Sequence, residues 1–417
     1  MRSRLVEIGR LFLKIGTIGF GGPATFYALM EDETVQRRGW LTRQHFVDLL
    51  GATNLIPGPN ATEMAMHIGY VRGGAMGLIV AGFGFIFPAA LVTAAFAWLY
   101  VQYGQLPHIA PVIAGIKPAV LAIIFTAGWR LGKKAINGWI VGFVAAAVVV
   151  ASMCGAREVP ALFCASLIGT AWLLLARRSS NGDGKSIGGM LAAAAVGGGA
   201  AGTARATYAA PLATLAAAST VTGSAVSLLK IGLFFLKVGA VLYGTGYVLF
   251  AYLHGGLVDQ YGWLTEDQLL DAIAIGQFTP GPIVSTATFI GYVLMAGDDG
   301  NHMLGMAGAA VATAGIFLPS FVLVAITNPI IPKLRKSRWT AAFLDAVNAA
   351  SMGLMAAVTI KLAWRIFFPK SELLSPNWQA LVIAILAGAV LLRWRVSAVW
   401  LVLGGAAAGA LFWLVGW

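Results

Sequence analysis

Residues 54 to 60 read NLIPGPN and residues 277 to 283 read QFTPGPI, so the tripeptide Pro-Gly-Pro occurs twice within apolar sequence. Proline lacks the amide donor that a helix needs, and glycine lowers the cost of leaving helical geometry. Each motif therefore predicts a break in a helix. A simple kink or a tight loop is the less specific interpretation, but two motifs at matching positions favour a shared role.

The composition is typical of a protein embedded in a membrane. The 417 residues are 59% hydrophobic and only 11% charged, whereas soluble domains have about 25% charged residues. Eight stretches approach the roughly 20 apolar residues that cross a hydrocarbon core: residues 74–100, 109–129, 138–153, 160–176, 303–326, 341–360, 380–392 and 396–417. These features predict an all-α polytopic membrane protein. The net charge of +12 then reports basic cytoplasmic loops, and no nucleic acid is expected as a partner.

The chain contains an internal repeat. With a shift of 223 residues, FLKIGTIGFGG (12–22) aligns with FLKVGAVLYGT (235–245), GWLT (39–42) with GWLT (262–265), and the two Pro-Gly-Pro motifs with each other. This ungapped alignment has 15 identities in the 48 positions from residue 12 to residue 59, which indicates a fused duplication. Later in the chain the shift becomes 231, which pairs Pro88 with Pro319 and Lys117 with Asn348.

The repeat predicts a division into a first half at 1–178, a linker at 179–224 with room for one weak helix, and a second half at 225–417. Residues 1–30 resemble a signal peptide, but Lys14 interrupts the apolar run, so a single retained first helix is predicted. Cys154 and Cys164 lie in apolar segments and predict buried free thiols.

Loop charges predict that the halves run in opposite directions. The loop at 37–43 carries three arginines, whereas the matching loop at 254–271 has neither lysine nor arginine. By the positive-inside tendency, the first loop is cytoplasmic and the second is external. The basic residues between 361 and 370 are an exception, because this topology places them outside.

Each Pro-Gly-Pro motif lies between two segments that are too short to cross the membrane. About 14 residues precede the first motif and about 12 follow it, or roughly 21 and 18 Å of helix against a core of about 30 Å. Each segment is therefore predicted to be a re-entrant helical hairpin that turns at mid-membrane. Broken segments at matching positions of inverted halves indicate a transporter binding site. The second half-helices begin at Asn60 and Ile283, and their positive dipole ends suit an anion.

Three lysines within apolar segments are predicted to converge on this site. Lys14 and Lys237 share a repeat position, each seven residues before a glycine, and Lys117 lies mid-span. For Lys14, an extended side chain that reaches the membrane interface is an equally good explanation. The complete set of candidate substrate-binding residues is Lys14, Gly21, Gly22, Asn54, Pro57, Gly58, Pro59, Asn60, Thr62, Lys117, Lys237, Gln277, Pro280, Gly281, Pro282, Ser285 and Thr286.

Carboxylates near the breaks are candidates for coupling transport to an ion. Glu63 follows the first Pro-Gly-Pro motif, and Asp48 and Asp271 share a repeat position before the motifs. Acidic groups at membrane depth commonly carry protons, although a structural pairing with a basic side chain is an equally good explanation. No grouping of residues predicts a catalytic site, a metal site or a cofactor.

These motifs resemble the chromate ion transporter (CHR) family in its long, two-domain form. The resemblance rests on FLKIGTIGFGGP (12–23), GWLT (39–42), NLIPGP (54–59) and their counterparts in the second half, where YGTGY (243–247) departs from the GFGGP pattern. It implies a secondary transporter that exports chromate across the bacterial inner membrane and confers chromate resistance. The implied ligands are chromate or sulfate, with membrane lipid around the protein and a homodimer left open. Sulfate-type uptake or exchange and an anion channel are the alternatives.

Overall fold

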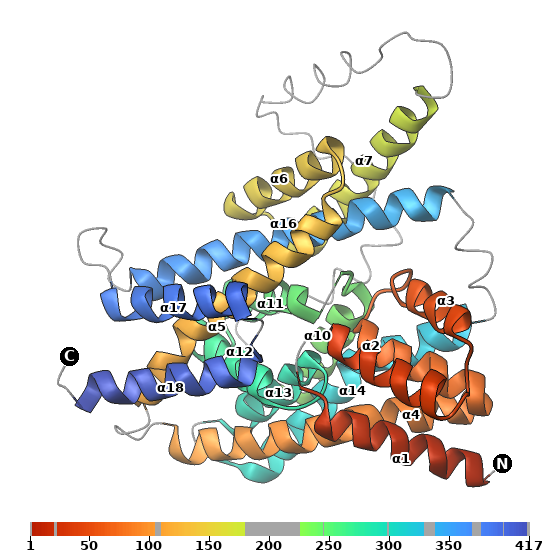
Figure 1. Ribbon diagram of the computed structural model, residues 1–417. Coiled ribbons are helices and arrows are strands. Elements are labelled where there is room, and N and C mark those ends of the chain that lie inside the picture. Colours follow the sequence, from red (N-terminus) through yellow and green to blue (C-terminus); the bar gives the residue numbers. More distant parts are fainter. Residues whose placement is uncertain are drawn as a thin grey trace.

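The computed structural model describes residues 2–20, 23–104, 110–179, 226–244, 246–297, 300–328, 338–368, 377–394 and 396–414, and these form helices without a strand (Figure 1). The first half contributes α1 (Arg2–Ile18), α2 (Pro23–Glu31), η1 (Asp32–Arg37), α3 (Arg43–Thr53), α4 (Asn60–Tyr103), α5 (Ala110–Ala135), α6 (Trp139–Met153) and α7 (Glu158–Ser179). The second half contributes α10 (Leu228–Val241), η3 (Gly246–Val248), α11 (Leu249–Leu253), η4 (His254–Gln260), α12 (Glu266–Phe278), η5 (Ile283–Ser285), α13 (Thr286–Ala296), α14 (His302–Thr327), α16 (Arg338–Phe367), α17 (Trp378–Trp394) and α18 (Ala398–Leu414). The greater part of the predicted linker, residues 180–224, lies outside the described residues.

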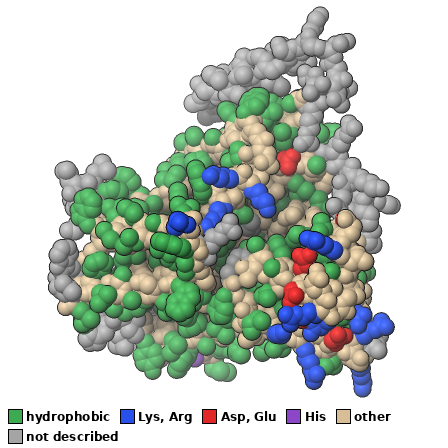
Figure 2. Space-filling view, in the orientation of Figure 1, with side chains coloured by type: hydrophobic (Ala, Val, Ile, Leu, Met, Phe, Trp, Pro, Cys, Tyr) green, Lys and Arg blue, Asp and Glu red, His purple; other side chains and the backbone are tan. Residues whose placement is uncertain are grey.

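The helices have the length and surface of a polytopic membrane protein. Among the described residues, α4, α5, α7, α14 and α16 are long and apolar enough to cross a membrane, and α6, α17 and α18 are shorter apolar helices. Large apolar side chains cover their outer faces: Phe83 is 62% exposed and Ile168 is 66% exposed. Figure 2 shows this apolar cover, with Lys and Arg gathered beside a few carboxylates at the lower right, where Figure 1 shows α1 and α3. The predicted class is confirmed.

The predicted single helix at residues 1–30 is wrong in detail, because α1 ends at Ile18 and a second helix, α2, begins at Pro23. Proline at the first position of a helix needs no amide donor, so Pro23 favours a new start. In the second half, α10 ends at Val241, and Gly244 has a φ of 101°. Since α10 ends before Gly244, Lys237 and Gly244 do not share a helical face, and α1 ends before Gly21, which lies outside the described residues.

The helices also end and begin around the two Pro-Gly-Pro motifs. In the first half, α3 ends at Thr53 and α4 begins at Asn60; in the second, α12 ends at Phe278 and η5 begins at Ile283. The segments that follow the motifs end at matching glycines. Gly74 bends α4 with a φ of 64°, and Gly297 ends α13 with a φ of 60°.

Glycines let the helices of each half approach closely. A Cβ at Gly16 of α1 would lie 2.5 Å from the carbonyl oxygen of Phe85 in α4, and a Cβ at Gly239 of α10 would overlap the carbonyl oxygen of Ile316 in α14. These two contacts occupy matching repeat positions. Because lipid tails are as apolar as leucine, helices in a membrane associate through such close backbone packing rather than through hydrophobic burial.

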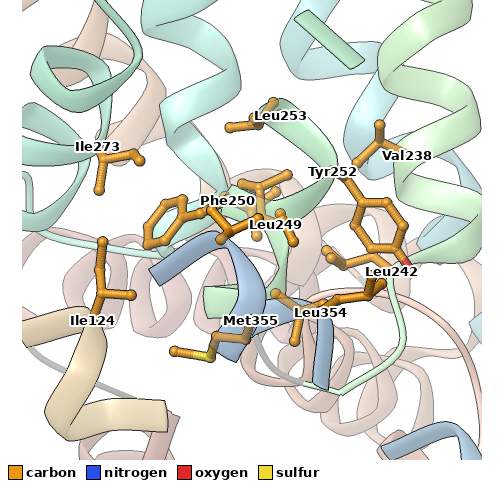
Figure 3. Packing of buried hydrophobic residues seen from close by; sticks show 14 of the residues in the cluster. Ile124, Val238, Leu242, Leu249, Phe250, Tyr252, Leu253, Ile273, Leu354 and Met355 are labelled. Atoms are coloured by element: carbon orange, nitrogen blue, oxygen red, sulfur yellow. The ribbon is translucent and has the colours of Figure 1, made fainter. Parts of the chain in front are cut away.

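The largest apolar core joins the two halves. Figure 3 shows Phe250 and Leu249 of α11 packed with Ile124 of α5, Ile273 of α12 and Met355 of α16. These side chains are almost fully buried. Since α5 belongs to the first half and the other helices to the second, neither half encloses this core alone.

The two cysteines differ from the prediction. Cys154 and Cys164 are free, as expected, but their side chains are exposed rather than buried. They lie at the end of α6 and on α7, helices whose outer faces carry other exposed apolar side chains such as Met153 and Leu167.

The close approach of α10 and α14 generates a stability prediction. Gly239→Val should lower the unfolding free energy in detergent by about 1–3 kcal/mol, because the new side chain overlaps backbone that cannot move aside. Gly132→Val is the matched control, since a Cβ at Gly132 of α5 would meet nothing within 4 Å. Equal unfolding free energies for the two variants, measured by chemical denaturation, would contradict the close packing.

Candidate functional site

The two Pro-Gly-Pro motifs bind the opposite halves through their backbones. The amide of Gly58 donates to the carbonyl oxygen of Leu242 over 2.8 Å, and the amide of Gly281 donates to the carbonyl oxygen of Gly19 over 2.8 Å. Gly58 matches Gly281 in the repeat, and Gly19 matches Leu242. The two hydrogen bonds are therefore reciprocal, and we call them the glycine clasp.

The glycine clasp needs glycine at both positions. Gly58 has a φ of 151° and Gly281 a φ of 103°, a region that other residues rarely adopt. A Cβ at Gly58 would overlap the carboxylate of Glu63 and the hydroxyl of Ser320, and one at Gly281 would lie 2.5 Å from Cβ of Ala89. Ser320 and Ala89 occupy matching repeat positions, so the same corner of each half closes on the motif of the other half.

A small central pocket of about 30 Å³ lies between the two motifs. Its wall includes the residues that start the two second half-helices, and Pro23, Phe26, Gly246 and Tyr247 complete it. The half-helix contributions are Pro59, Asn60 and Ala61 from one half and Pro282, Ile283 and Val284 from the other, which match one another in the repeat.

Backbone amides are the main polar groups that the pocket offers. The amides of Thr62 and Glu63 donate to the carbonyl oxygen of Pro59, whereas the first amides of α4, at Asn60 and Ala61, precede the first intrahelical bond. The side chain of Asn60 lies 2.8 Å from Oδ1 of Asn54 and 3.1 Å from the carbonyl oxygens of Gly58 and Gly244, which joins the two ends of the break. Such a helix start suits an anion, because its free amides and its dipole both favour negative charge.

The three lysines are not among the residues that line the central pocket. Nζ of Lys14 donates to Glu33 over 2.8 Å at a 51% exposed position, and Lys237 is exposed. The buried face of α1 consists of Ile8, Leu11, Phe12 and Ile15, and Lys14 lies off that face. The predicted convergence of the lysines on the pocket is therefore not seen.

Lys117 instead joins a carboxylate cluster between the halves. Its Nζ lies 2.7 Å from Oδ1 of Asp267 and 3.5 Å from Oδ1 of Asp271, both on α12. The hydroxyl of Tyr100 donates to Asp271 over 2.9 Å. A predicted ligand-binding residue and a predicted coupling residue thus form an ion pair that links α5 to α12.

The other predicted residues lie in three kinds of place. Gly21 and Gly22 are outside the described residues. Pro57, Pro280 and Gln277 flank the breaks, and Asp48 accepts from Gln44 over 3.2 Å at the surface. Hydroxyls follow the motifs: Ser285 accepts from Thr93 over 3.3 Å, Thr286 donates to the carbonyl of Ile283, and Thr62 is buried with a hydroxyl that has no partner among the described residues.

Two buried polar residues near the pocket were missed by sequence reasoning. Oγ of Ser320 donates to Oε1 of Glu63 over 3.2 Å, and His67 lies one turn after Glu63, fully buried. The signal for Ser320 is its place directly after Pro319, at the repeat position of Ala89. The signal for His67 is its spacing of four residues from Glu63, which puts both on one helical face.

The sequence matches a family of known proteins. The family model described as "Chromate transporter" matches residues 6–176 and 229–410 of the chain. The chain belongs to the chromate transporter family. Its two matched regions contain both Pro-Gly-Pro motifs, and membership of a transporter family points to transport rather than to an enzyme.

Similar proteins come from several bacteria. The "Chromate transport protein" of Cupriavidus metallidurans is 33% identical to this transporter over 362 residues, which are 87% of this chain and 83% of that protein. The "Chromate transport protein" of Pseudomonas aeruginosa is 33% identical over 356 residues, or 84% and 79% of the two chains. The "Probable chromate transport protein" of Synechococcus elongatus is 29% identical over 370 residues, or 86% and 84%. No solved structure matches this transporter.

The glycine clasp predicts that alanine reduces transport more at Gly281 than at Gly297, although both glycines have a positive φ. Gly281→Ala should reduce transport by about tenfold, which corresponds to about 1.4 kcal/mol, because the methyl group meets Ala89 next to the clasp. Gly297→Ala is the control: its φ is also positive, at 60°, but a Cβ there meets nothing within 4 Å. Initial rates of labelled chromate transport, normalised to protein in the membrane, measure both. Equal rates in the two variants would contradict a role for the close approach.

The Lys117 cluster predicts that substitutions at Lys117 and Asp271 have non-additive effects on the unfolding free energy. Lys117→Ala should destabilise the protein because it leaves the half-buried cluster with excess negative charge, and Asp271→Asn should partly restore stability in the double variant. A double-mutant cycle of unfolding free energies in detergent should give a coupling energy of about 0.5–3 kcal/mol. Additive effects of the two changes would show that the ion pair contributes nothing.

Proposed function

We propose that this chain is a secondary active transporter that exports chromate across the bacterial inner membrane and thereby confers chromate resistance. The observation that carries the proposal is the central pocket, where the starts of two half-helices from different halves meet between two Pro-Gly-Pro motifs. Family membership supports chromate as the transported ion.

In this proposal the halves are 1–178 and 225–417, joined by the linker 179–224, and they run in opposite directions. Reciprocal contacts support a two-fold relation between the halves, because under such a relation each contact between the halves recurs with the roles of the halves exchanged. The glycine clasp has this form. The inversion itself is supported by the loop charges, which are basic at 37–43 and lack lysine and arginine at 254–271. Each Pro-Gly-Pro segment is then a re-entrant hairpin, since α3 has 11 residues and α12 has 13, and about 20 residues are needed to span.

The charge pairs support a cytoplasmic face at α1 and η1. Arg38 and Arg72 both lie near Glu7 there, and Arg37 pairs with Asp32. The external face lies at η4 and the start of α12. The basic residues that contradict the positive-inside tendency have partners on that face: Lys361 binds Asp259 over 3.2 Å, and Arg365 binds Glu266 over 3.3 Å.

The pocket supports a substrate that accepts hydrogen bonds. No lysine or arginine is among the residues that line it, so the first amides of α4 are the donors on offer, with Asn60 and Tyr247 as the polar side chains of its wall. A tetrahedral dianion presents acceptors in every direction and suits these donors, which is also why sulfate is the expected competitor. The pocket of about 30 Å³ has room for a few waters at most, so it must widen before an oxyanion enters.

Sulfate uptake or exchange is the second candidate function, because the same donors would bind sulfate. An anion channel is the third, and it would need a continuous polar path. The small volume and mostly apolar wall of the pocket favour a carrier over a channel. In each case membrane lipid surrounds the exposed apolar faces. We also propose that the chain forms a homodimer.

Cells that express the chain should accumulate less labelled chromate than matched cells with an empty vector and should tolerate a higher chromate concentration. Labelled sulfate in the same cells separates the candidates: higher sulfate accumulation with unchanged chromate accumulation identifies uptake of sulfate. Equal accumulation of both labels in expressing and control cells would overturn the proposed function.

The inverted arrangement has its own test. Thr42 caps α3 and Thr265 caps α12 at the same repeat position. Cysteines introduced singly at these positions, with Cys154 and Cys164 replaced by Ala, should react with a membrane-impermeant maleimide from opposite faces of oriented vesicles. Labelling of both positions from one face would contradict the inversion.

A further inference from the structure

A line of buried polar side chains runs between α4 and α14, from the first turn of α4, just beyond the residues that line the central pocket, to the end of α14. Glu63 and His67 of α4 and Ser320 of α14 are fully buried. Asn328 caps the C-terminal end of α14, and its buried amide nitrogen has no partner among the described residues. Glu63 and His67 lie one helical turn apart, and Ser320 and Asn328 lie about 12 Å apart along their helix at 1.5 Å per residue.

Within the described part of the chain, Glu63 is buried without a cation. Its Oε1 accepts from Ser320 over 3.2 Å, and its Oε2 has no hydrogen-bond partner there. The titratable groups that face it are Tyr27 from α2 and Tyr243 beyond the end of α10.

The charged groups of the neighbouring helices do not compensate Glu63. Lys14 of α1 binds Glu33, and Asp48 of α3 accepts from Gln44. Neither α13 nor the part of α14 around Ser320 carries a charged residue. An ionised carboxylate in such a place is costly, so a bound proton stabilises it.

His67 is the next group along the line. Both of its ring nitrogens are buried without a hydrogen bond from any described residue, and the side chain of Asn328 faces it. An imidazole can accept a proton at one nitrogen and release one from the other, which makes it suited to pass protons between neighbours. Under the proposed topology, the end of α14 is cytoplasmic, so this line leads from the pocket to the cytoplasm.

The carboxyl of Glu63 is also in contact with the glycine clasp. It packs directly against Gly58, whose amide holds the carbonyl of Leu242 in the other half. The repeat counterpart of Glu63 is Thr286, which cannot titrate, so the repeat supplies one such carboxyl at the pocket rather than two. A dianion in the pocket would be repelled by an ionised Glu63 and tolerated by a protonated one.

We propose that Glu63 binds one proton together with the transported oxyanion and that His67 carries this proton between Glu63 and the cytoplasmic end of α14. The inference rests on the proposed function and adds a proton as the co-substrate that moves with the transported oxyanion. By linkage, an oxyanion that favours the protonated carboxyl is itself favoured by that proton, so the two move in the same direction. A chromate dianion with one proton carries a single net negative charge, and an inside-negative potential drives that charge outward.

The test uses the purified full-length chain in lipid vesicles that contain a pH-sensitive dye. In the unaltered protein, a chromate gradient should move protons in the same direction as chromate. In Glu63→Gln, which keeps the shape of the protonated carboxyl, exchange of labelled for unlabelled chromate should persist, while gradient-driven proton movement should fall by about tenfold or more. His67→Gln should slow proton movement more than exchange, and Glu63→Asp should retain proton movement.

Glu7→Gln is the control, because Glu7 is a half-exposed carboxylate that lies near Arg38 and Arg72 away from the pocket. It should keep both activities. Proton movement that survives in Glu63→Gln, or that runs opposite to chromate, overturns the proposal. Loss of exchange and of proton movement together in Glu63→Gln also overturns it, since Glu63 would then be needed for the anion itself.

Infrared difference spectroscopy gives a readout that does not depend on transport. Addition of chromate at neutral pH should increase the carbonyl absorption of a protonated carboxylic acid, and this band should be absent in Glu63→Gln. An unchanged band in Glu63→Gln contradicts proton binding at Glu63. If the unaltered protein exchanges neither labelled chromate nor labelled sulfate, the proposed function itself has failed, and the exchange assay shows this separately from the proton assay.

Discussion

The structure depends on two reciprocal backbone hydrogen bonds, from Gly58 to Leu242 and from Gly281 to Gly19. A break in a helix at membrane depth leaves amides and carbonyls without intrahelical partners, and a bilayer core offers no water to satisfy them. Each Pro-Gly-Pro motif meets this constraint by donating to the end of the first long helix of the other half. The two halves are therefore mutually dependent, and the pocket exists only where they meet.

This constraint also explains where charge is found. The ion pairs in the described part of the chain, such as Lys14 with Glu33, Lys361 with Asp259 and the Lys117 cluster between the halves, are made by residues that do not line the pocket. The pocket itself presents backbone amides and one asparagine amide. An anion that binds weakly to dipoles can leave again, whereas a buried lysine would hold it tightly. In the proposed mechanism Glu63, in the first turn of α4 and next to Gly58, supplies a charge whose state can change during transport.

The sequence predicted a large part of the fold, because apolar length and the repeat are local or periodic signals. The span expected at residues 303–326 is α14 (302–327), and the breaks flank both Pro-Gly-Pro motifs. The division of the first 30 residues into two helices could have been inferred from Pro23, which starts a helix more readily than it continues one.

The site was harder to predict, because it is built from contacts across the repeat. The apolar spacing of Ile8, Leu11, Phe12 and Ile15 already places Lys14 off the buried face. The sequence alone could therefore have predicted that Lys14 does not line the pocket. The pairing of Lys117 with Asp267 and the meeting of Glu63 with Ser320 were not, since 150 and 257 residues separate the partners. Single-sequence patterns carry no information on which distant residues meet.

The central claim is that an oxyanion binds where the two interrupted segments meet. A structure determined with chromate bound tests it most directly. The account predicts density for the anion between the starts of α4 and η5, beside Asn60 and Ile283, with the glycine clasp opened or widened on one side. Density at Lys117 or another cation, with the space between the two motifs still closed, would contradict it.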